Sequence, residues 1–196
     1  MRIIAGQYKG RRLLPPRGHT TRPITDRVKT ALFSILAADV DDAVVLDLFA
    51  GTGSLGIEAI SRGARRCYFA ERDRLAIARL RRNITAVGAD DRCEVWPGDI
   101  FRTLRRRLAP LPDPVDLAFI DPPYRLVANW RWDDAAEKLF APIAAAAAPD
   151  ATAILRCERN ISLPEAFGPL CVRDRRDYGN MSLVFLSACG ADGGQC

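Results

Sequence analysis

The stretch VVLDLFAGTGSLG, residues 44–56, gives the strongest indication of the fold. Val44 to Phe49 form a short apolar run of the kind that builds a buried strand, and a G-x-G-x-x-G pattern follows it where a helix begins at about Ser54. At such a junction Gly51 permits a tight turn, Gly53 lets the backbone approach a ligand, and Gly56 lets the helix lie close to the strand. The stretch therefore predicts the first strand, turn and helix of an α/β fold.

Further strands and helices alternate on both sides of this unit. A helix is expected over residues 25–38, and strands over residues 67–70, 93–96, 117–120, 152–157, 170–173 and 182–186. Helices are expected between most of them, at residues 73–88, 100–108 and 134–148. This alternation predicts a Rossmann-like, mostly parallel seven-stranded sheet covered on both faces, and the final two strands, which no helix separates, should be antiparallel.

Composition limits the class of protein. A chain of 196 residues that is 48% hydrophobic suffices for one ordinary domain. No stretch approaches about twenty uninterrupted apolar residues, and a charged residue, Arg2, directly follows Met1. We therefore expect neither a membrane span nor a signal peptide, and we expect the protein to be cytoplasmic. The six cysteines include no C-x-x-C pair and His19 is the only histidine, so no metal site is expected and the cysteines should be free thiols.

The basic residues are concentrated at the N-terminus. Residues 1–36 contain eight basic residues and one acidic residue, which gives +7, so the other 160 residues sum to −2. Residues 1–14 predict a small hairpin around Gly6 and Gly10, and we expect residues 1–24 to form a basic arm that meets a polyanion, although an arm that only aids solubility is the alternative. The candidate contacts are Arg2, Lys9, Arg11, Arg12 and Arg22.

Two carboxylates refine the expected ligand of the glycine loop. Glu71 ends the second strand twenty positions after Gly51, where it can accept both hydroxyls of an adenosine ribose; a solvated charge is the alternative. Asp47 is aimed at the same turn, where it would repel a pyrophosphate but attract the ammonium and sulfonium cations of S-adenosylmethionine. The predicted cofactor pocket also includes Phe49, Asp99 for the adenine amino group and Ile100 for its ring, although Asp99 is equally suited to cap the next helix.

The stretch AFIDPPYR, residues 118–125, follows the fourth strand and should deliver its polar residues to the same edge of the sheet. Asp121 can accept one N–H of an exocyclic base amine and the carbonyl of Pro122 the other, so that the amine's lone pair is directed at a methyl group. Tyr124 offers a ring on which an unpaired base can stack, a contact worth about 1–3 kcal/mol. The alternative is an ordinary turn followed by a core aromatic residue, and the role of Arg125 is left open.

These motifs resemble those of a known family. The stretch from Asp47 to Gly56 together with DPPY at residues 121–124 resembles the class I S-adenosylmethionine-dependent amino-methyltransferases. RIIAGQYKGRRL at residues 2–13, followed by RPITDRV at residues 22–28, more narrowly resembles the RsmD family of 16S rRNA guanine-N2 methyltransferases, and the likeness extends to about residue 187.

The resemblance implies a methyltransferase domain over residues 25–187 that modifies the N2 amine of a guanine in 16S rRNA. It implies that the arm binds rRNA in a partly assembled small ribosomal subunit and that Arg22 and Thr25 border the pocket. We expect a monomer, and residues 188–196 should form a disordered tail.

Three alternatives remain open at this stage. A DNA adenine-N6 methyltransferase would use the same catalytic turn, but the chain has no room for a target-recognition domain of the usual size. A non-catalytic RNA-binding or ribosome-assembly module is disfavoured because Gly51, Gly53, Glu71, Asp121 and Tyr124 are all intact. An NAD-dependent oxidoreductase is disfavoured by Asp47 and by the absence of a substrate domain.

Overall fold

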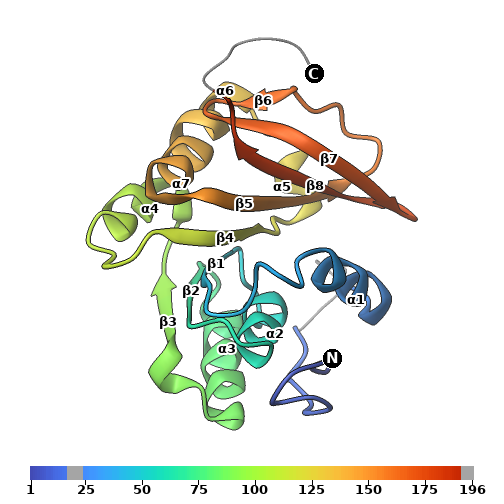
Figure 1. Cartoon of the computed structure of the whole chain (residues 1–196), viewed down its shortest axis with the longest axis vertical. Helices are drawn as coiled ribbons and strands as arrows, with labels where there is room; N and C mark the ends of the chain where they lie inside the picture. Colours follow the sequence, from blue (N-terminus) through green and yellow to red (C-terminus); the bar gives the residue numbers. More distant parts are fainter. Residues whose placement is uncertain (17–23, 191–196) are drawn as a thin grey trace.

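A computed structural model describes residues 1–16 and 24–190, which form an eight-stranded sheet with helices on both faces (Figure 1). The strands are β1 (Val44–Leu48), β2 (Arg66–Glu71), β3 (Cys93–Pro97), β4 (Val115–Ile120), β5 (Ala147–Glu158), β6 (Ala166–Phe167), β7 (Leu170–Tyr178) and β8 (Met181–Ala188). The α-helices are α1 (Asp26–Ile35), α2 (Ser54–Ser61), α3 (Arg74–Val87), α4 (Ile100–Leu108), α5 (Tyr124–Val127), α6 (Trp132–Ala135) and α7 (Ala141–Ala146). The structure also contains a 3₁₀ turn, η1 (Asp90–Arg92), and a π turn, η2 (Ala136–Phe140).

The strand order is β3-β2-β1-β4-β5-β8-β7-β6, with parallel pairing from β3 to β5 and antiparallel pairing from β5 to β6. The predicted α/β class, the parallel body of the sheet and the antiparallel final pair are confirmed. The predicted strand number, seven, is wrong by one. The additional strand, β6, has two residues, which is too short to show any alternation of apolar and polar positions.

The last predicted helix also differs in detail. The predicted helix over residues 134–148 is present as a continuous helical segment that comprises α6, the π turn η2 and α7. It ends at Ala146, because β5 already begins at Ala147, which pairs with Val115 of β4. Alanine favours helix, but Ala148 precedes Pro149, and contact with the proline ring disfavours helical geometry for the preceding residue. Local helix propensity therefore yields to the proline and to strand pairing.

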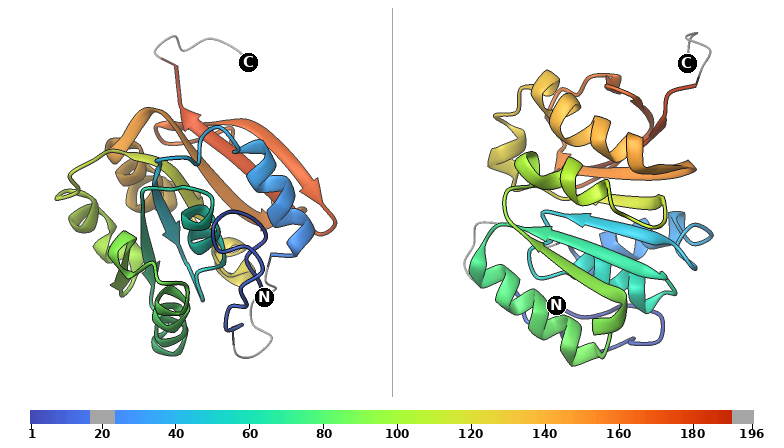
Figure 2. Two further views of the ribbon diagram at one scale, coloured as in Figure 1. Left: turned by 60° about the horizontal axis from the view of Figure 1, so that its bottom comes forward. Right: turned by 90° about the vertical axis from the view of Figure 1, so that its left-hand side faces the viewer.

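Helices cover both faces of the sheet (Figure 2), and each face has its own apolar core. On one face α1, α2 and α3 cover the sheet through residues such as Phe33, Ile57 and Leu80, together with Ile3 of the N-terminal segment. On the other face α4, η2 and α7 contribute Leu104, Phe140 and Ile143. Because both faces are covered, the exposed ends of the parallel strands are left as the place where ligands can enter.

The N-terminal segment forms the predicted hairpin but does not project from the domain. Arg2 and Arg12 form an antiparallel bridge, and the amides of Ile4 and Ala5 donate to the carboxylate of Glu58 in α2 at 2.8 and 3.0 Å. Glu58 is completely buried and pairs at 3.0 Å with Lys29 of α1. The desolvation cost of a buried ion pair is offset only when further hydrogen bonds satisfy the charged groups. Here the backbone amides of the hairpin supply those bonds to Glu58.

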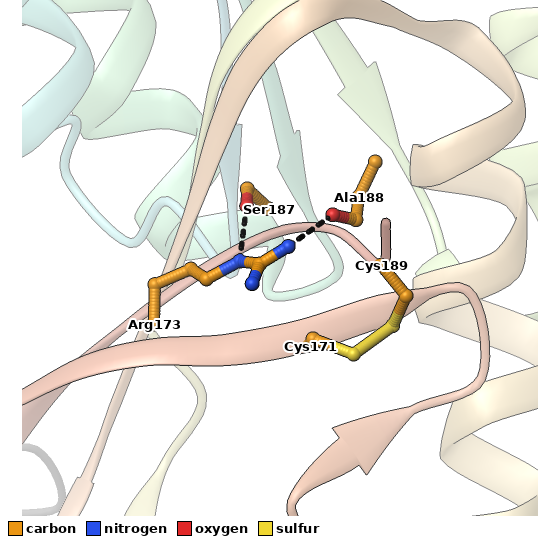
Figure 3. Close-up of a disulfide and its surroundings, with 5 residues drawn as sticks. All are labelled: Cys171, Arg173, Ser187, Ala188 and Cys189. Carbon is orange, nitrogen blue, oxygen red and sulfur yellow. Dashed lines mark hydrogen bonds between the residues drawn. A yellow bond between two sulfur atoms is a disulfide. The ribbon is translucent and has the colours of Figure 1, made fainter. Parts of the chain in front are cut away.

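The expectation that all cysteines are free is wrong for one pair. Cys171 of β7 and Cys189, just after β8, form a disulfide with an S–S distance of 2.08 Å (Figure 3). The antiparallel pairing of β7 with β8 brings their Cα atoms to 5.0 Å, although they are 18 positions apart in the sequence. Sequence spacing does not reveal such a pairing, because it depends on strand register. Cys67, Cys93 and Cys157 are free thiols.

Some expectations fall on residues 17–23 and 191–196, among them the role of Arg22 and most of the C-terminal tail, and these lie outside the described residues. No helix within residues 1–16 and 24–190 is both long and apolar enough to cross a membrane. The same residues contain no group of three or more metal-binding side chains.

Candidate active site

A cavity of about 550 Å³ opens at the carboxyl ends of β1, β2, β3 and β4. In a parallel sheet these ends meet at one edge, so loops that are distant in sequence lie together there. Six of the predicted site residues line the cavity: Phe49, Gly51, Glu71, Asp99, Ile100 and Asp121. The sequence therefore identified six of the 23 described residues that line the cavity.

The glycine loop shapes one side of this cavity. Gly51 has a positive φ of 57° and faces open space, so the ligand side of the turn is free of side-chain atoms. Gly53, which we expected to allow close approach of a ligand, instead faces the protein, because an added Cβ would lie 2.4 Å from Leu80 Cδ1. Gly56 has its predicted role: an added Cβ would lie 2.3 Å from the ring of Phe69, so α2 packs closely on β2 only with glycine there.

Asp47 supports the loop from beneath. Its side chain is 1% exposed, is not among the residues that line the cavity, and accepts a hydrogen bond from the Gly56 amide at 2.8 Å. Burial raises the pKa of Asp47 to about 8; the bond from Gly56 opposes this rise, and the charges of Asp121 and Glu71 add to it. A carboxyl that is mostly protonated at neutral pH offers little attraction to a cation, so the position of Asp47 supports a structural role in the loop.

Glu71 connects two turns at the cavity wall. One carboxylate oxygen accepts the Gly51 amide at 2.8 Å, and the other accepts the amides of Arg72 and Asp73 at 2.7 and 2.8 Å. Each carboxylate oxygen can accept more than one hydrogen bond, so the oxygen that bonds Gly51 keeps capacity for a further donor. Glu71 thus lies where a ligand hydroxyl could reach it.

Phe49, Asp99 and Ile100 form the side of the cavity next to α4. Phe49 has a positive φ of 63°, which is unfavourable for a residue with a side chain. The centroid of its ring lies 6.0 Å from the ring centroid of Phe101. Asp99 caps α4 by accepting the Phe101 amide at 3.0 Å and also lines the cavity, so the two proposed roles of this residue are compatible. Ile100 contributes an apolar surface.

Asp121 follows β4 directly, and its backbone amide donates to the carbonyl of Leu48 in β1. Its side chain is 18% exposed and accepts a hydrogen bond from Nε of Arg156. Burial raises the pKa of Asp121, while the charge of Arg156 and its hydrogen bond oppose the rise. The arginine therefore favours the ionised carboxylate, which is the form that accepts hydrogen bonds.

Arg156 was not identified from the sequence, yet it completes this corner of the cavity. It lies in β5, is 6% exposed, lines the cavity, and its guanidinium lies 5.6 Å from the ring centroid of Tyr124. The pairing of Ile120 with Leu155 places the next residue of each strand, Asp121 and Arg156, side by side. The available signal was an arginine inside the apolar run of residues 152–157, since a charge in a buried strand requires a partner.

The remaining residues of the DPPY stretch lie around this corner. Pro122 is buried, whereas Pro123 and Leu126 line the cavity. Tyr124 begins the short helix α5, is half-buried, packs against the core that contains Phe33, and is not among the cavity-lining residues. Its ring contacts the corner through Arg156.

The predicted basic contacts are on the hairpin, apart from Arg22. Arg2 pairs with Asp26 at 2.9 Å, and Arg11 donates to the carbonyl of Ala86 at 3.1 Å and lies over the ring of Tyr8. Lys9 and Arg12 are exposed. Met1, Pro16 and Ile24, which flank this basic segment, line the cavity, so the basic hairpin lies close to its mouth.

Comparison with known proteins places these features in a family context. A family model described as "Conserved hypothetical protein 95" matches residues 1–187. The chain is 35% identical over 182 residues to "Putative rRNA methyltransferase YlbH" of Bacillus subtilis (strain 168), an alignment that covers 91% of this chain and 94% of that protein.

A relative and a solved structure, both from Escherichia coli, are also similar. The chain is 39% identical over 125 residues to "Ribosomal RNA small subunit methyltransferase D" of strain K12. This alignment covers 64% of this chain and 61% of that relative, which is less than two thirds of its length. A solved structure described as "Putative methyltransferase yhhF from Escherichia coli" superposes with a TM-score of 0.78 at 30% identity, covering 96% of this chain and 97% of that one.

Proposed function

We propose a reaction for this cavity on the premise that the chain belongs to the Conserved hypothetical protein 95 family, the RsmD family of methyltransferases, whose model spans residues 1–187. The protein transfers the methyl group of S-adenosylmethionine to the exocyclic N2 amine of a guanine in the 16S rRNA of the small ribosomal subunit. It acts in the cytoplasm, as a monomer, on a partly assembled particle. The observation that carries the proposal is the carboxylate of Asp121, which accepts a hydrogen bond from Arg156 at the wall of the cavity.

The cavity residues suit S-adenosylmethionine. A volume of about 550 Å³ lies within the ordinary range for small-molecule sites. Glu71 would accept the ribose hydroxyls, Asp99 the adenine amine, and Ile100 and Phe49 would contact the adenine ring. Gly51 leaves room beside the loop for the rest of the molecule, and Asp47 would contribute by fixing that loop. The bound cofactor supplies a methyl group on a positively charged sulfur.

The protein's contribution to the chemistry is orientation of the amine. The lone pair of a guanine N2 amine is delocalised into the ring, so the amine is a weak nucleophile. Asp121 accepts one N–H and the carbonyl of Pro122 accepts the other, which turns the lone pair toward the methyl group. The ionised carboxylate is essential to this role, because a protonated carboxyl would compete as a donor. Tyr124 would support the base by stacking.

The basic hairpin is the proposed RNA contact. Lys9, Arg11 and Arg12 lie on a segment anchored through the buried Glu58, so they are held in a fixed position relative to the cavity. Such a rigid arm would position the RNA backbone without reading its sequence. Arg22 is proposed as a further RNA contact.

One experiment tests the reaction directly. Ribosomal particles from a strain that lacks the protein are incubated with the purified enzyme and labelled S-adenosylmethionine, and the modified nucleotide is mapped. The Asp121→Ala variant should lose methyl transfer while it binds the cofactor with nearly unchanged affinity. If that variant turns over at the wild-type rate, the catalytic assignment is wrong; if the label maps to adenine or to DNA, the substrate assignment is wrong.

The RNA contact requires a separate measurement. The Arg11→Ala/Arg12→Ala variant should bind RNA more weakly and with a shallower dependence on salt, because fewer counterions are released on binding. Unchanged affinity and salt dependence would exclude the hairpin as an RNA contact.

A further inference from the structure

A second pocket, of about 380 Å³, lies between α4 and the strands β2 and β3, remote from the catalytic cavity. Arg66 of β2, Arg106 and Arg107 of α4, Glu94 of β3 and the segment Pro110–Pro112 contribute to its walls. It lies on the face that α4 covers, opposite to the face on which the N-terminal hairpin packs. The sequence already marks α4 as a basic helix, IFRTLRRRL, and the proposed reaction assigns no role to these arginines.

The positive charge of this pocket is not neutralised by the part of the chain that the structure describes. Within residues 1–16 and 24–190, none of Arg66, Arg105, Arg106 and Arg107 forms an ion pair. The only acid among the pocket residues, Glu94, accepts a hydrogen bond from Trp96 Nε1 at 2.8 Å. Three arginine side chains and one carboxylate therefore leave the pocket with excess positive charge.

Arg107 provides a second and independent indication of a ligand. Its Nε is buried and has no hydrogen-bond partner among the described residues. An unsatisfied buried donor lowers stability, so a hydrogen-bond acceptor that reaches Arg107 Nε would stabilise the protein. A helix C-terminus does favour basic residues. That preference does not explain why Arg106 and Arg107 line a pocket together with Arg66 of β2.

The chemistry of the pocket fits phosphate. The guanidinium group is planar and presents paired donors that match the oxygens of a phosphate. Base recognition would require an exposed aromatic ring, but Tyr68 and Trp96 are each 3% exposed and stack on one another with centroids 5.0 Å apart. The walls thus offer charge and hydrogen-bond donors rather than a stacking surface.

We propose that the pocket formed by Arg66, Arg106 and Arg107 binds backbone phosphates of the RNA substrate, as a second contact on the face opposite to the hairpin. The inference rests on the proposed function, because it takes the polyanion to be the methylated RNA. Glu71 and Ile100 line the catalytic cavity, and Arg66 lies five residues from Glu71 along β2, about 16 Å away. Arg107 lies seven residues from Ile100 along α4, about 10 Å away. An RNA chain several nucleotides long spans these distances, so one substrate can occupy both sites.

The test is the salt dependence of RNA binding by Arg106→Gln/Arg107→Gln, measured with an RNA fragment or particle that the wild-type enzyme methylates. Two lost phosphate contacts should reduce the slope of log K against log[salt] by about 1.4 and lower the affinity at 0.1 M salt about 25-fold relative to wild type. The turnover number at saturating RNA and the affinity for S-adenosylmethionine should not change, because neither residue lines the catalytic cavity.

A matched control removes the same charge elsewhere. Lys138→Gln/Arg176→Gln also removes two positive charges, but Lys138 pairs with Asp134 and Arg176 with Asp174, so RNA binding should hardly change. Equal slopes for the α4 variant and wild type, or an equal loss in the control, would overturn the inference. If wild-type enzyme methylates no RNA, the proposed function fails; if it methylates RNA and only the α4 variant behaves as wild type, the pocket inference alone fails.

Discussion

Replacement of Arg156 tests most directly how the catalytic corner works. Arg156→Met keeps an unbranched side chain about as long as the arginine stem up to Nε but removes its charge and its bond to Asp121, whereas Arg156→Lys keeps the charge. The two side chains are 7% and 18% exposed, and removal of one partner from a buried ion pair typically costs about 3–5 kcal/mol. Burial raises the pKa of Asp121, and Arg156 opposes this rise. Without Arg156, Asp121 can therefore relieve the cost by binding a proton.

The sign and size of the effect follow from this argument. Without Arg156 the pKa of Asp121 rises further, so a smaller fraction of the carboxylate is ionised at neutral pH. A loss of about 3 kcal/mol of stabilisation of the carboxylate would lower methyl transfer by up to about 100-fold, with the full loss at pH values below the pKa of Asp121. Below the pKa of Asp121 in the variant, the rate should rise about tenfold for each pH unit, and the difference from wild type should close once Asp121 ionises. Arg156→Lys should retain more activity than Arg156→Met at pH 7.

The assay is single-turnover methyl transfer to RNA between about pH 6 and 9, with cofactor affinity and thermal stability measured in parallel. Arg159→Met is the matched control, because Arg159 is exposed, lies just beyond β5 and pairs with Asp177 instead. A folded Arg156→Met enzyme with wild-type rates at every pH would refute the reasoning. A loss that does not recover at high pH would show that Arg156 acts only by position, not by keeping Asp121 ionised.

Three other predictions follow from the site and the disulfide. Glu71→Gln should weaken binding of S-adenosylmethionine about 10- to 100-fold, the worth of a hydrogen bond to a charged acceptor; calorimetry that gives an unchanged affinity would contradict this. Asp47→Asn should gain stability over wild type as pH rises from about 4 to 8, by up to about 1.4 kcal/mol per pH unit, because the buried wild-type carboxyl keeps its proton while the unfolded one loses it. Urea unfolding with the same pH dependence for both proteins would exclude it. Reduction of the Cys171–Cys189 disulfide, which links residues 18 positions apart, should cost about 3 kcal/mol of stability; Cys171→Ser should melt at the same temperature with or without reductant.

The sequence predicted those parts of the fold and site that depend on local requirements. The apolar run before Gly51 predicts a buried strand, and the glycines that follow predict a turn where a ligand can enter. Glu71 and Asp121 were predicted because Glu71 ends a strand and Asp121 directly follows one, and the carboxyl ends of parallel strands lie together. In these cases the residue type and its distance from a strand end carry the information.

The tertiary structure decided how those residues behave. The partnership of Asp121 with Arg156 requires the register of β4 with β5, and the disulfide requires that of β7 with β8. Asp47 looks like a charged ligand contact in the sequence, but desolvation by the surrounding fold raises its pKa and assigns it to the loop. The sequence by itself determined which residues reach the edge of the sheet, whereas their charge states and partners depend on burial and strand register, which exist only once distant segments have packed together.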